Sequence, residues 1–137
     1  MASIEVTKDF SRSAEAVWAW IGDTGGVAAW IPAIDASRMD GDVRHVVFTD
    51  GAPARERIVA FDEEARTYSY EYIDGPLPLE HYRSTVSVAA DGDDHCTVRW
   101  SAEFGAESAE VEAELATAIE AIYSAALDEL AIKAVRV

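Results

Sequence analysis

The stretch SAEVEAELATAIEAIYSAALDELAIKAVRV, residues 108–137, decides the fold. It contains neither Gly nor Pro, and Ala, Glu, Leu and Ile dominate it. Its apolar residues recur at spacings of three and four, as expected for one face of an α-helix. The residues of that face are Val111, Leu115, Ile119, Ile122, Ala126 and Leu130. We therefore expect one long amphipathic helix over residues 108–134.

The chain before this helix reads as short alternating segments separated by turn residues such as Asp40-Gly41 and Asp50-Gly51. The expected strands are 3–10, 33–39, 43–49, 54–61, 66–73, 80–89 and 96–104. Two short helices are expected at 13–22, with Ser13 as N-cap, and at 25–31, ending at Pro32. This order predicts an α+β fold in which a strand, two short helices and a six-strand antiparallel meander precede the long helix. A sheet that grips a helix in this way encloses a cavity.

Composition limits the possible functions. A length of 137 residues predicts one domain, 1–137. The sequence contains no run of eighteen apolar residues, so we expect no membrane-spanning segment. The formal net charge of −15 disfavours binding to nucleic acids or anionic lipids. The acidity is explained either by solubility or by steering of a cationic ligand. The N-terminus has no apolar segment typical of a signal peptide, so we expect a cytoplasmic protein, as a monomer or weak homodimer.

Strand parity places two opposite charges on the inner face of the sheet. A three-residue loop, Thr49-Asp50-Gly51, pairs Arg44 with Glu56, whereas a two-residue turn would set Arg44 against Arg57, which is unfavourable. A buried charge needs a partner, and each of these has one. Arg44 is then either a ligand anchor with Glu56 as general base, or the two form a structural ion pair.

Aromatic residues form the rest of the inner face. They are Tyr68, Tyr70, Tyr72, Tyr82, Trp100 and Phe104. The same parity places Ile58 and Ala60 inward and Phe61 outward. This wall is either ordinary core packing or the lining of a ligand cavity, where tyrosine hydroxyls find partners. Three tryptophans on the two short helices, Trp18, Trp20 and Trp30, are expected to form a lid over one end of the cavity, or else a partner-binding surface.

The sequence offers no motif for a metal or a cofactor. The histidines His45, His81 and His95 are scattered, with no metal-ligand spacing on one element. The single cysteine, Cys96, lies next to a turn and is expected to be inert. Gly25-Gly26 lacks the Lys-Ser/Thr that completes a phosphate-binding loop. We therefore expect neither metal nor cofactor.

The segments SRSAEAVWAWIGDTGGVAAWIPAI, GDVRHVVFTDG, ARERIVAFDEEARTYSYEYIDGPLPLEHYRSTVSV and TVRWSAEF, followed by the long helix, carry a family resemblance. The chain resembles the helix-grip superfamily of START domains and birch-pollen-type allergens, often called SRPBCC. Within it, the chain is most similar to the bacterial polyketide cyclase/dehydrase-like branch. The resemblance covers essentially the whole chain and is specific for fold rather than for function.

Three functions follow. The first is binding of a small apolar or aromatic molecule, lipid- or polyketide-like, between the sheet and the long helix. The second is a cofactor-independent cyclase or dehydratase with Glu56 and Tyr70 as acid–base residues. The third is a protein–protein interaction module. The expected ligand-binding residues are Arg44, Phe48, Glu56, Tyr68, Tyr70, Tyr82, Trp100, Leu115, Ile119 and Ile122.

The helix is also rich in alanine, and small side chains leave space unfilled. We therefore expect a cavity on the order of 300–1,000 Å³. It should take a flat or elongated apolar molecule with an acidic or hydroxyl group directed at Arg44. Ala118→Phe or Ala126→Trp should then block it.

Overall fold

Seven antiparallel strands form one sheet in the order β1-β7-β6-β5-β4-β3-β2 in the computed structural model, which describes residues 1–135. The strands are β1 (Ala2–Phe10), β2 (Ile34–Asp40), β3 (Val43–Phe48), β4 (Pro53–Asp62), β5 (Thr67–Asp74), β6 (His81–Ala90) and β7 (Cys96–Gly105). The helices are α1 (Ala14–Ile21), the 3₁₀-helix η1 (Thr24–Ala29) and α2 (Ala109–Val135). This architecture confirms the predicted α+β helix-grip fold. Arg136 and Val137, which end the stretch that predicted the helix, lie outside the described residues.

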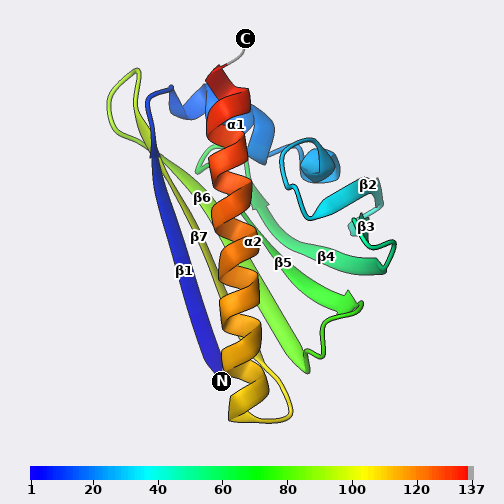
Figure 1. Ribbon diagram of the computed structural model, residues 1–137. Coiled ribbons are helices and arrows are strands. Elements are labelled where there is room, and N and C mark those ends of the chain that lie inside the picture. Colours follow the sequence, from blue (N-terminus) through cyan, green and yellow to red (C-terminus); the bar gives the residue numbers. More distant parts are fainter. Residues whose placement is uncertain (136–137) are drawn as a thin grey trace.

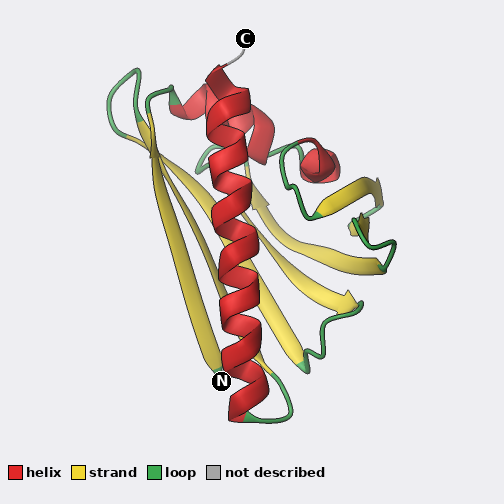
Figure 2. Ribbon diagram, viewed as in Figure 1, coloured by secondary structure: helices red, strands yellow, loops and turns green. Residues whose placement is uncertain are grey.

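The long helix α2 runs along one face of the curved sheet, and α1 and η1 lie near its C-terminal end (Figures 1 and 2). Ser108 caps α2, because its hydroxyl accepts from the Val111 amide at 3.2 Å. Ser13 caps α1 in the same way, accepting from the Ala16 amide at 3.1 Å. The long helix and the two short elements together cover the face of the sheet on which the core forms.

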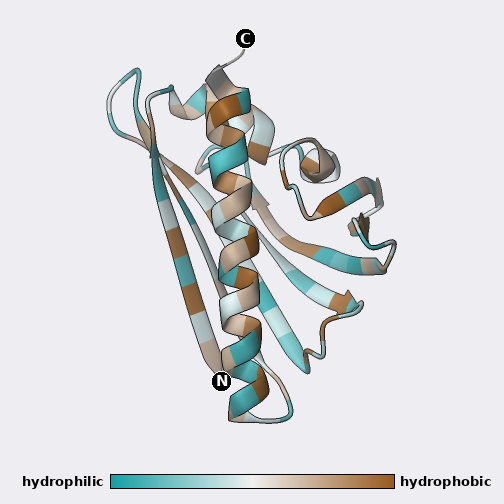
Figure 3. Cartoon of the chain, viewed as in Figure 1, coloured by the Kyte–Doolittle hydropathy of each residue, from teal (hydrophilic) through white to brown (hydrophobic). Residues whose placement is uncertain are grey.

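The core follows the alternation of the strands, and Figure 3 shows the resulting bands along β1. In β7, Val98, Trp100, Ala102 and Phe104 are all buried, as their parity predicts. The buried residues of α2 are Leu115, Ile119, Tyr123, Ala126, Leu127, Leu130 and Ala134. This stripe passes through Tyr123, which the predicted helix face did not include.

The hairpin between β3 and β4 sets the register that matters for the site. Gly51 has a φ of 91°, and the Phe48 amide donates to the Ala52 carbonyl at 2.9 Å. The strands then pair Val46 with Ala54 and Arg44 with Glu56. The register predicted from the three-residue loop is confirmed.

A β-bulge in β4 makes one parity prediction wrong. The register with β5 shifts between Ile58 and Ala60, so that Ala60 is exposed rather than inward. Phe61 lies opposite Tyr68 and remains 48% exposed, as predicted, although its ring contacts Tyr68 and Trp18 at centroid distances of 6.2 and 5.6 Å. An extra residue in a strand breaks the regular inward–outward alternation beyond it, and the sequence pattern alone does not predict this.

Candidate functional site

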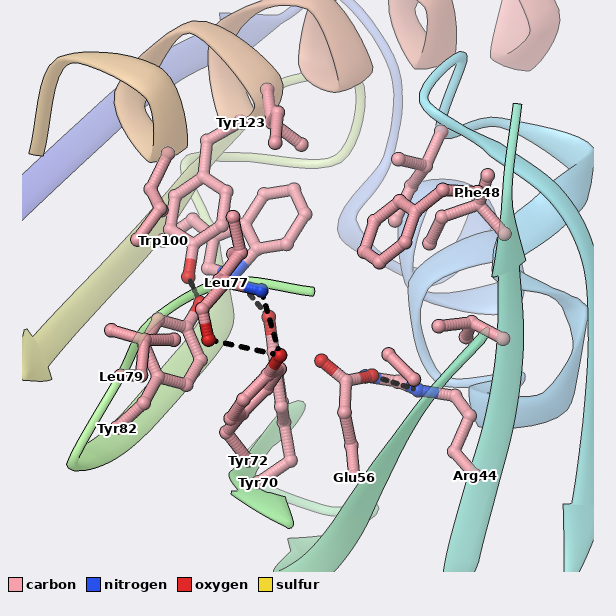
Figure 4. A pocket seen from close by; sticks show the side chains of 16 residues that line it. Arg44, Phe48, Glu56, Tyr70, Tyr72, Leu77, Leu79, Tyr82, Trp100 and Tyr123 are labelled. Carbon is pink, nitrogen blue, oxygen red and sulfur yellow. Dashed lines mark hydrogen bonds and ion pairs between the residues drawn. The ribbon is translucent and has the colours of Figure 1, made fainter. Parts of the chain in front are cut away.

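A cavity of about 60 Å³ lies between the sheet and α2 (Figure 4). Its walls come from β2 to β7, from α2 and from the loop between β5 and β6. The lining residues are Ile31, Ile34, Arg44, Val46, Phe48, Ala54, Glu56, Tyr70, Tyr72, Leu77, Leu79, Tyr82, Trp100, Ile119, Ile122 and Tyr123. Most are aliphatic or aromatic, and one ion pair stands among them. The cavity is thus an apolar space with a single charged end.

The predicted volume was wrong, because large side chains fill much of the space. Tyr123 projects from α2 and stacks on Trp100, with ring centroids 3.8 Å apart. Leu77 and Leu79 cover the cavity from the β5–β6 loop (Figure 4). A space of about 60 Å³ holds a few water molecules at most. A larger molecule can fit only if some of these side chains move.

The alanines of α2 do not create the cavity. Ala113, Ala118, Ala121 and Ala125 are exposed on the outer face of the helix, so the expectation that Ala118→Phe blocks the cavity is wrong. Ala126 is fully buried but does not line the cavity. The four exposed alanines reflect helix propensity on a solvent-facing surface rather than space left for a ligand.

Arg44 and Glu56 form the charged end of the cavity. Arg44 Nε donates to Glu56 Oε1 at 2.9 Å, and the Arg44 side chain is 3% exposed. Arg44 Nη1 also donates to the Thr24 carbonyl at 3.0 Å and to the Tyr68 hydroxyl at 3.1 Å. Burial alone disfavours the charged guanidinium, but Tyr68 and Glu56 outweigh it and hold the pKa of Arg44 above its ordinary value. Arg44 therefore stays charged at any physiological pH.

A network of hydroxyl groups forms the opposite side of the cavity. The hydroxyls of Tyr82 and Tyr123 are hydrogen-bonded, and Tyr123 also meets Ser84 Oγ at 2.8 Å. Trp100 Nε1 donates to Ser84 Oγ at 3.0 Å and to the Tyr70 hydroxyl at 3.3 Å. Ser84 in turn donates to the Ser101 carbonyl at 2.9 Å. The network joins β5, β6, β7 and α2 through polar groups that burial would otherwise leave unpaired.

These buried tyrosines are neutral at physiological pH. Burial is the main cause that raises the pKa of Tyr70, and it raises the pKa of Tyr82 and Tyr123 well above the ordinary value. Each hydroxyl therefore keeps its proton. The cavity consequently offers tyrosine O–H groups on one side and a carboxylate on the other.

The loop between β5 and β6 covers the cavity with Leu77, and the hydroxyl of Tyr72 holds this leucine in place. The Leu77 amide donates to the Tyr72 hydroxyl at 3.1 Å, and that hydroxyl donates to the Leu77 carbonyl at 3.3 Å. Gly75 lies so close to the same hydroxyl that a Cβ there would overlap it. The position of Leu77 over the cavity therefore depends on Tyr72.

The structure places most of the predicted site residues around one cavity. Eight of them line it, namely Arg44, Phe48, Glu56, Tyr70, Tyr82, Trp100, Ile119 and Ile122. Tyr68 lies behind Arg44 and packs against Trp18, at 6.4 Å between ring centroids. Leu115 is buried elsewhere on the helix. Sequence reasoning missed Tyr123 and Ser84, although Tyr123 lies four residues after Ile119 and Ser84 shares the parity of Tyr82.

The tryptophans of the short helical region pack inward. Trp30 packs against Trp100 at 5.6 Å, and Trp18 Nε1 donates to Glu63 at 3.0 Å. Trp20 is half-buried. Trp18 and Trp30 thus cover one end of the core, where the sequence predicted a lid.

Other chemistries find little support in the described residues. Among residues 1–135, no three His, Cys, Asp or Glu side chains are grouped so that they could hold a metal ion. Cys96 is fully buried, and burial raises the pKa of its thiol. No helix in the described part of the chain combines the length and hydropathy needed to span a membrane.

Comparison with known proteins defines the class. Residues 1–135 match the profile of the polyketide cyclase/dehydrase and lipid transport family, and the chain belongs to this family, part of the SRPBCC group. The predicted resemblance is thereby confirmed. No curated protein sequence matches the chain. The family's description covers proteins that transform or carry hydrophobic compounds, which agrees with an apolar cavity.

Solved structures show the same fold. The protein XoxI from Bacillus cereus is 29% identical, with a TM-score of 0.92 over 99% of this chain and 97% of that one. The ZhuI aromatase/cyclase from Streptomyces sp. R1128 is 15% identical, with a TM-score of 0.85 over 98% and 94%. Norcoclaurine synthase from Thalictrum flavum, solved with dopamine and hydroxybenzaldehyde, is 18% identical, with a TM-score of 0.76 over 98% and 86%. For ZhuI and norcoclaurine synthase, the similarity shows a common fold and nothing about function.

Proposed function

We propose that the protein binds a small apolar or aromatic molecule, lipid- or polyketide-like, between the sheet and α2. The observation that carries the proposal is the apolar cavity closed by one ion pair. Aromatic and aliphatic walls with a few fixed polar groups are typical of ligand pockets. On the same fold, norcoclaurine synthase was solved in complex with dopamine and hydroxybenzaldehyde, and ZhuI is described as an aromatase/cyclase.

The ligand gains room by displacing the β5–β6 loop. Leu77 and Leu79 are half-buried, and the Tyr72 hydroxyl holds Leu77 through two hydrogen bonds. Each such bond contributes about 1 kcal/mol, so a ligand that buries its own apolar surface can offset their loss. Binding in this account replaces two leucine side chains with the ligand and leaves the sheet unchanged.

A cofactor-independent enzyme is the second candidate. One observation favours it, since Glu56 and Tyr70 both line the same cavity and can act as base and acid. The cavity also contains Tyr82 and Tyr123, whose hydroxyls remain protonated. Turnover of an aromatic or polyketide-like compound that depends on Glu56 would distinguish catalysis from simple binding.

Fluorescence of N-phenyl-1-naphthylamine, a neutral apolar dye, tests the proposed binding. The wild-type protein should enhance and blue-shift the emission. Ala54→Leu should abolish the effect, because Ala54 is 3% exposed and lines the cavity. Ala60→Leu is the matched control, as Ala60 lies exposed on the same strand. If the dye does not bind, or if both variants reduce binding equally, the cavity is not a ligand site and the interaction-module hypothesis takes its place.

A further inference from the structure

The two charged residues of the cavity, Arg44 and Glu56, differ in how accessible they are to a ligand. Arg44 directs Nε to Glu56 and Nη1 to Thr24 and Tyr68. Its guanidinium carbon also lies over the Tyr70 ring, 4.7 Å from the centroid. Two of the three guanidinium nitrogens of Arg44, Nε and Nη1, are therefore engaged by the protein itself.

Glu56 is the member of the pair that faces the cavity. Its Oε1 accepts from Arg44, and its side chain is 16% exposed, against 3% for Arg44. In Figure 4 its second carboxylate oxygen points away from Arg44 and toward the centre of the cavity. A ligand entering from the apolar side thus meets a carboxylate oxygen, which only accepts hydrogen bonds.

We propose that Glu56 determines specificity by selecting neutral ligands that carry a hydrogen-bond donor, such as a phenol, enol or alcohol, and by rejecting carboxylates. The inference rests on the proposed binding function. It differs from the expectation of an acidic group directed at Arg44, because Arg44 is almost completely buried and already bonds Glu56, Thr24 and Tyr68.

Charge explains why the favoured donor is neutral. A ligand carboxylate would place a second negative charge beside Glu56, and the Arg44 charge that could offset it is already paired with Glu56 and is more deeply buried. A ligand ammonium would have to lose its hydration next to an ion pair whose charges already cancel. A neutral hydroxyl suffers neither penalty and donates to a charged acceptor.

Three matched competitors test this selection by displacing N-phenyl-1-naphthylamine from the wild-type protein at pH 7. They are 2-naphthol, 2-methoxynaphthalene and 2-naphthoate, which share one apolar ring system. We expect 2-naphthol to bind about tenfold more tightly than 2-methoxynaphthalene, because only 2-naphthol can donate a hydrogen bond to the Glu56 carboxylate. We expect 2-naphthoate to bind more weakly than both.

Glu56→Gln tests the residue itself. The glutamine keeps an oxygen for Arg44 and turns an amide donor toward the cavity, so the preference for 2-naphthol over 2-naphthoate should fall at least tenfold. Glu71→Gln is the control, because Glu71 pairs with Arg83 on the exposed side of β5 and loses the same charge. It should leave the preference unchanged.

The outcomes separate the two proposals. A wild-type protein that binds the dye but takes 2-naphthoate as well as 2-naphthol overturns the role of Glu56 and leaves ligand binding intact. Equal binding of 2-naphthol and 2-methoxynaphthalene does the same. Failure of the dye itself to bind overturns ligand binding, and the selection with it. The wild-type ranking needs no variant, so the test stands even if Glu56→Gln does not fold.

Discussion

Removing one member of the Arg44–Glu56 pair should strongly destabilise the protein. In the wild-type protein Arg44 is 2% exposed, and Glu56→Leu leaves this buried cation with hydrogen bonds to Thr24 and Tyr68, at 3.0 and 3.1 Å, but without a negative partner. A buried charge that loses its partner costs about 3–5 kcal/mol. Arg44→Met should cost less, about 3 kcal/mol, because water reaches the Glu56 side chain more readily.

The double variant isolates the interaction between the two charges. Arg44→Met with Glu56→Leu leaves no buried charge, so its cost should fall below the sum of the single changes by about 2–3 kcal/mol. Arg83 and Glu71 provide the control cycle. This pair also bridges adjacent strands, but its atoms are 3.4 Å apart and its side chains are about half exposed. Its coupling should stay below about 1 kcal/mol.

Urea unfolding, followed by tryptophan fluorescence and far-UV circular dichroism, measures both cycles. Coincident transitions from the two probes would justify a two-state treatment. If Glu56→Leu loses less than about 1 kcal/mol, or if the two couplings are equal, the cavity end is wet and the ion pair does not act as a buried one.

Further changes probe the network, the loop and the thiol. The pKa values of Tyr70, Tyr82 and Tyr123 are raised in the folded state, so the folded protein retains protons that the unfolded chain releases, and stability should fall as the pH rises above about 10. Absorbance at 295 nm should show their ionisation together with the loss of circular dichroism, and complete phenolate formation in a folded protein would contradict this. Tyr72→Phe removes both bonds to Leu77, so it should cost about 1–2 kcal/mol and speed dye association in stopped-flow measurements, whereas an unchanged rate would mean that the loop does not control access. Cys96, fully buried, should react with Ellman's reagent only as fast as the protein unfolds, and rapid labelling of the native protein would show that this end of the core opens.

The fold and the register could be predicted from the sequence because each rests on local chemistry. The absence of Gly and Pro after Ser108 determines the long helix. Asp50-Gly51 sets the hairpin, and the cost of opposing Arg44 and Arg57 selects one register over another. These signals act within a few residues or across one strand pair, where simple rules hold.

The sequence-based predictions are wrong where a single inserted residue or a contact between distant segments determines the structure. The bulge between Ile58 and Ala60 interrupts the alternation of β4 and leaves Ala60 exposed, and the sequence pattern gives no sign of it. The exposure of Ala118 depends on the rotation of α2 about its axis, which a mixed Ala-rich helix specifies weakly. The size of the cavity depends on how Tyr123 and Leu77 pack. The packing of segments that are distant in the sequence cannot be predicted from local sequence patterns.

Methyl-resolved NMR during a titration with 2-naphthol tests the central claim most directly, since it reports where the ligand lies. We expect large chemical-shift changes for the methyl groups of Leu77, Ile119 and Ile122, which line the cavity. Val59 and Ile132, which are 37% and 49% exposed away from it, should stay unchanged. Changes confined to those exposed methyl groups, or no saturable change at all, would contradict a ligand site between the sheet and α2.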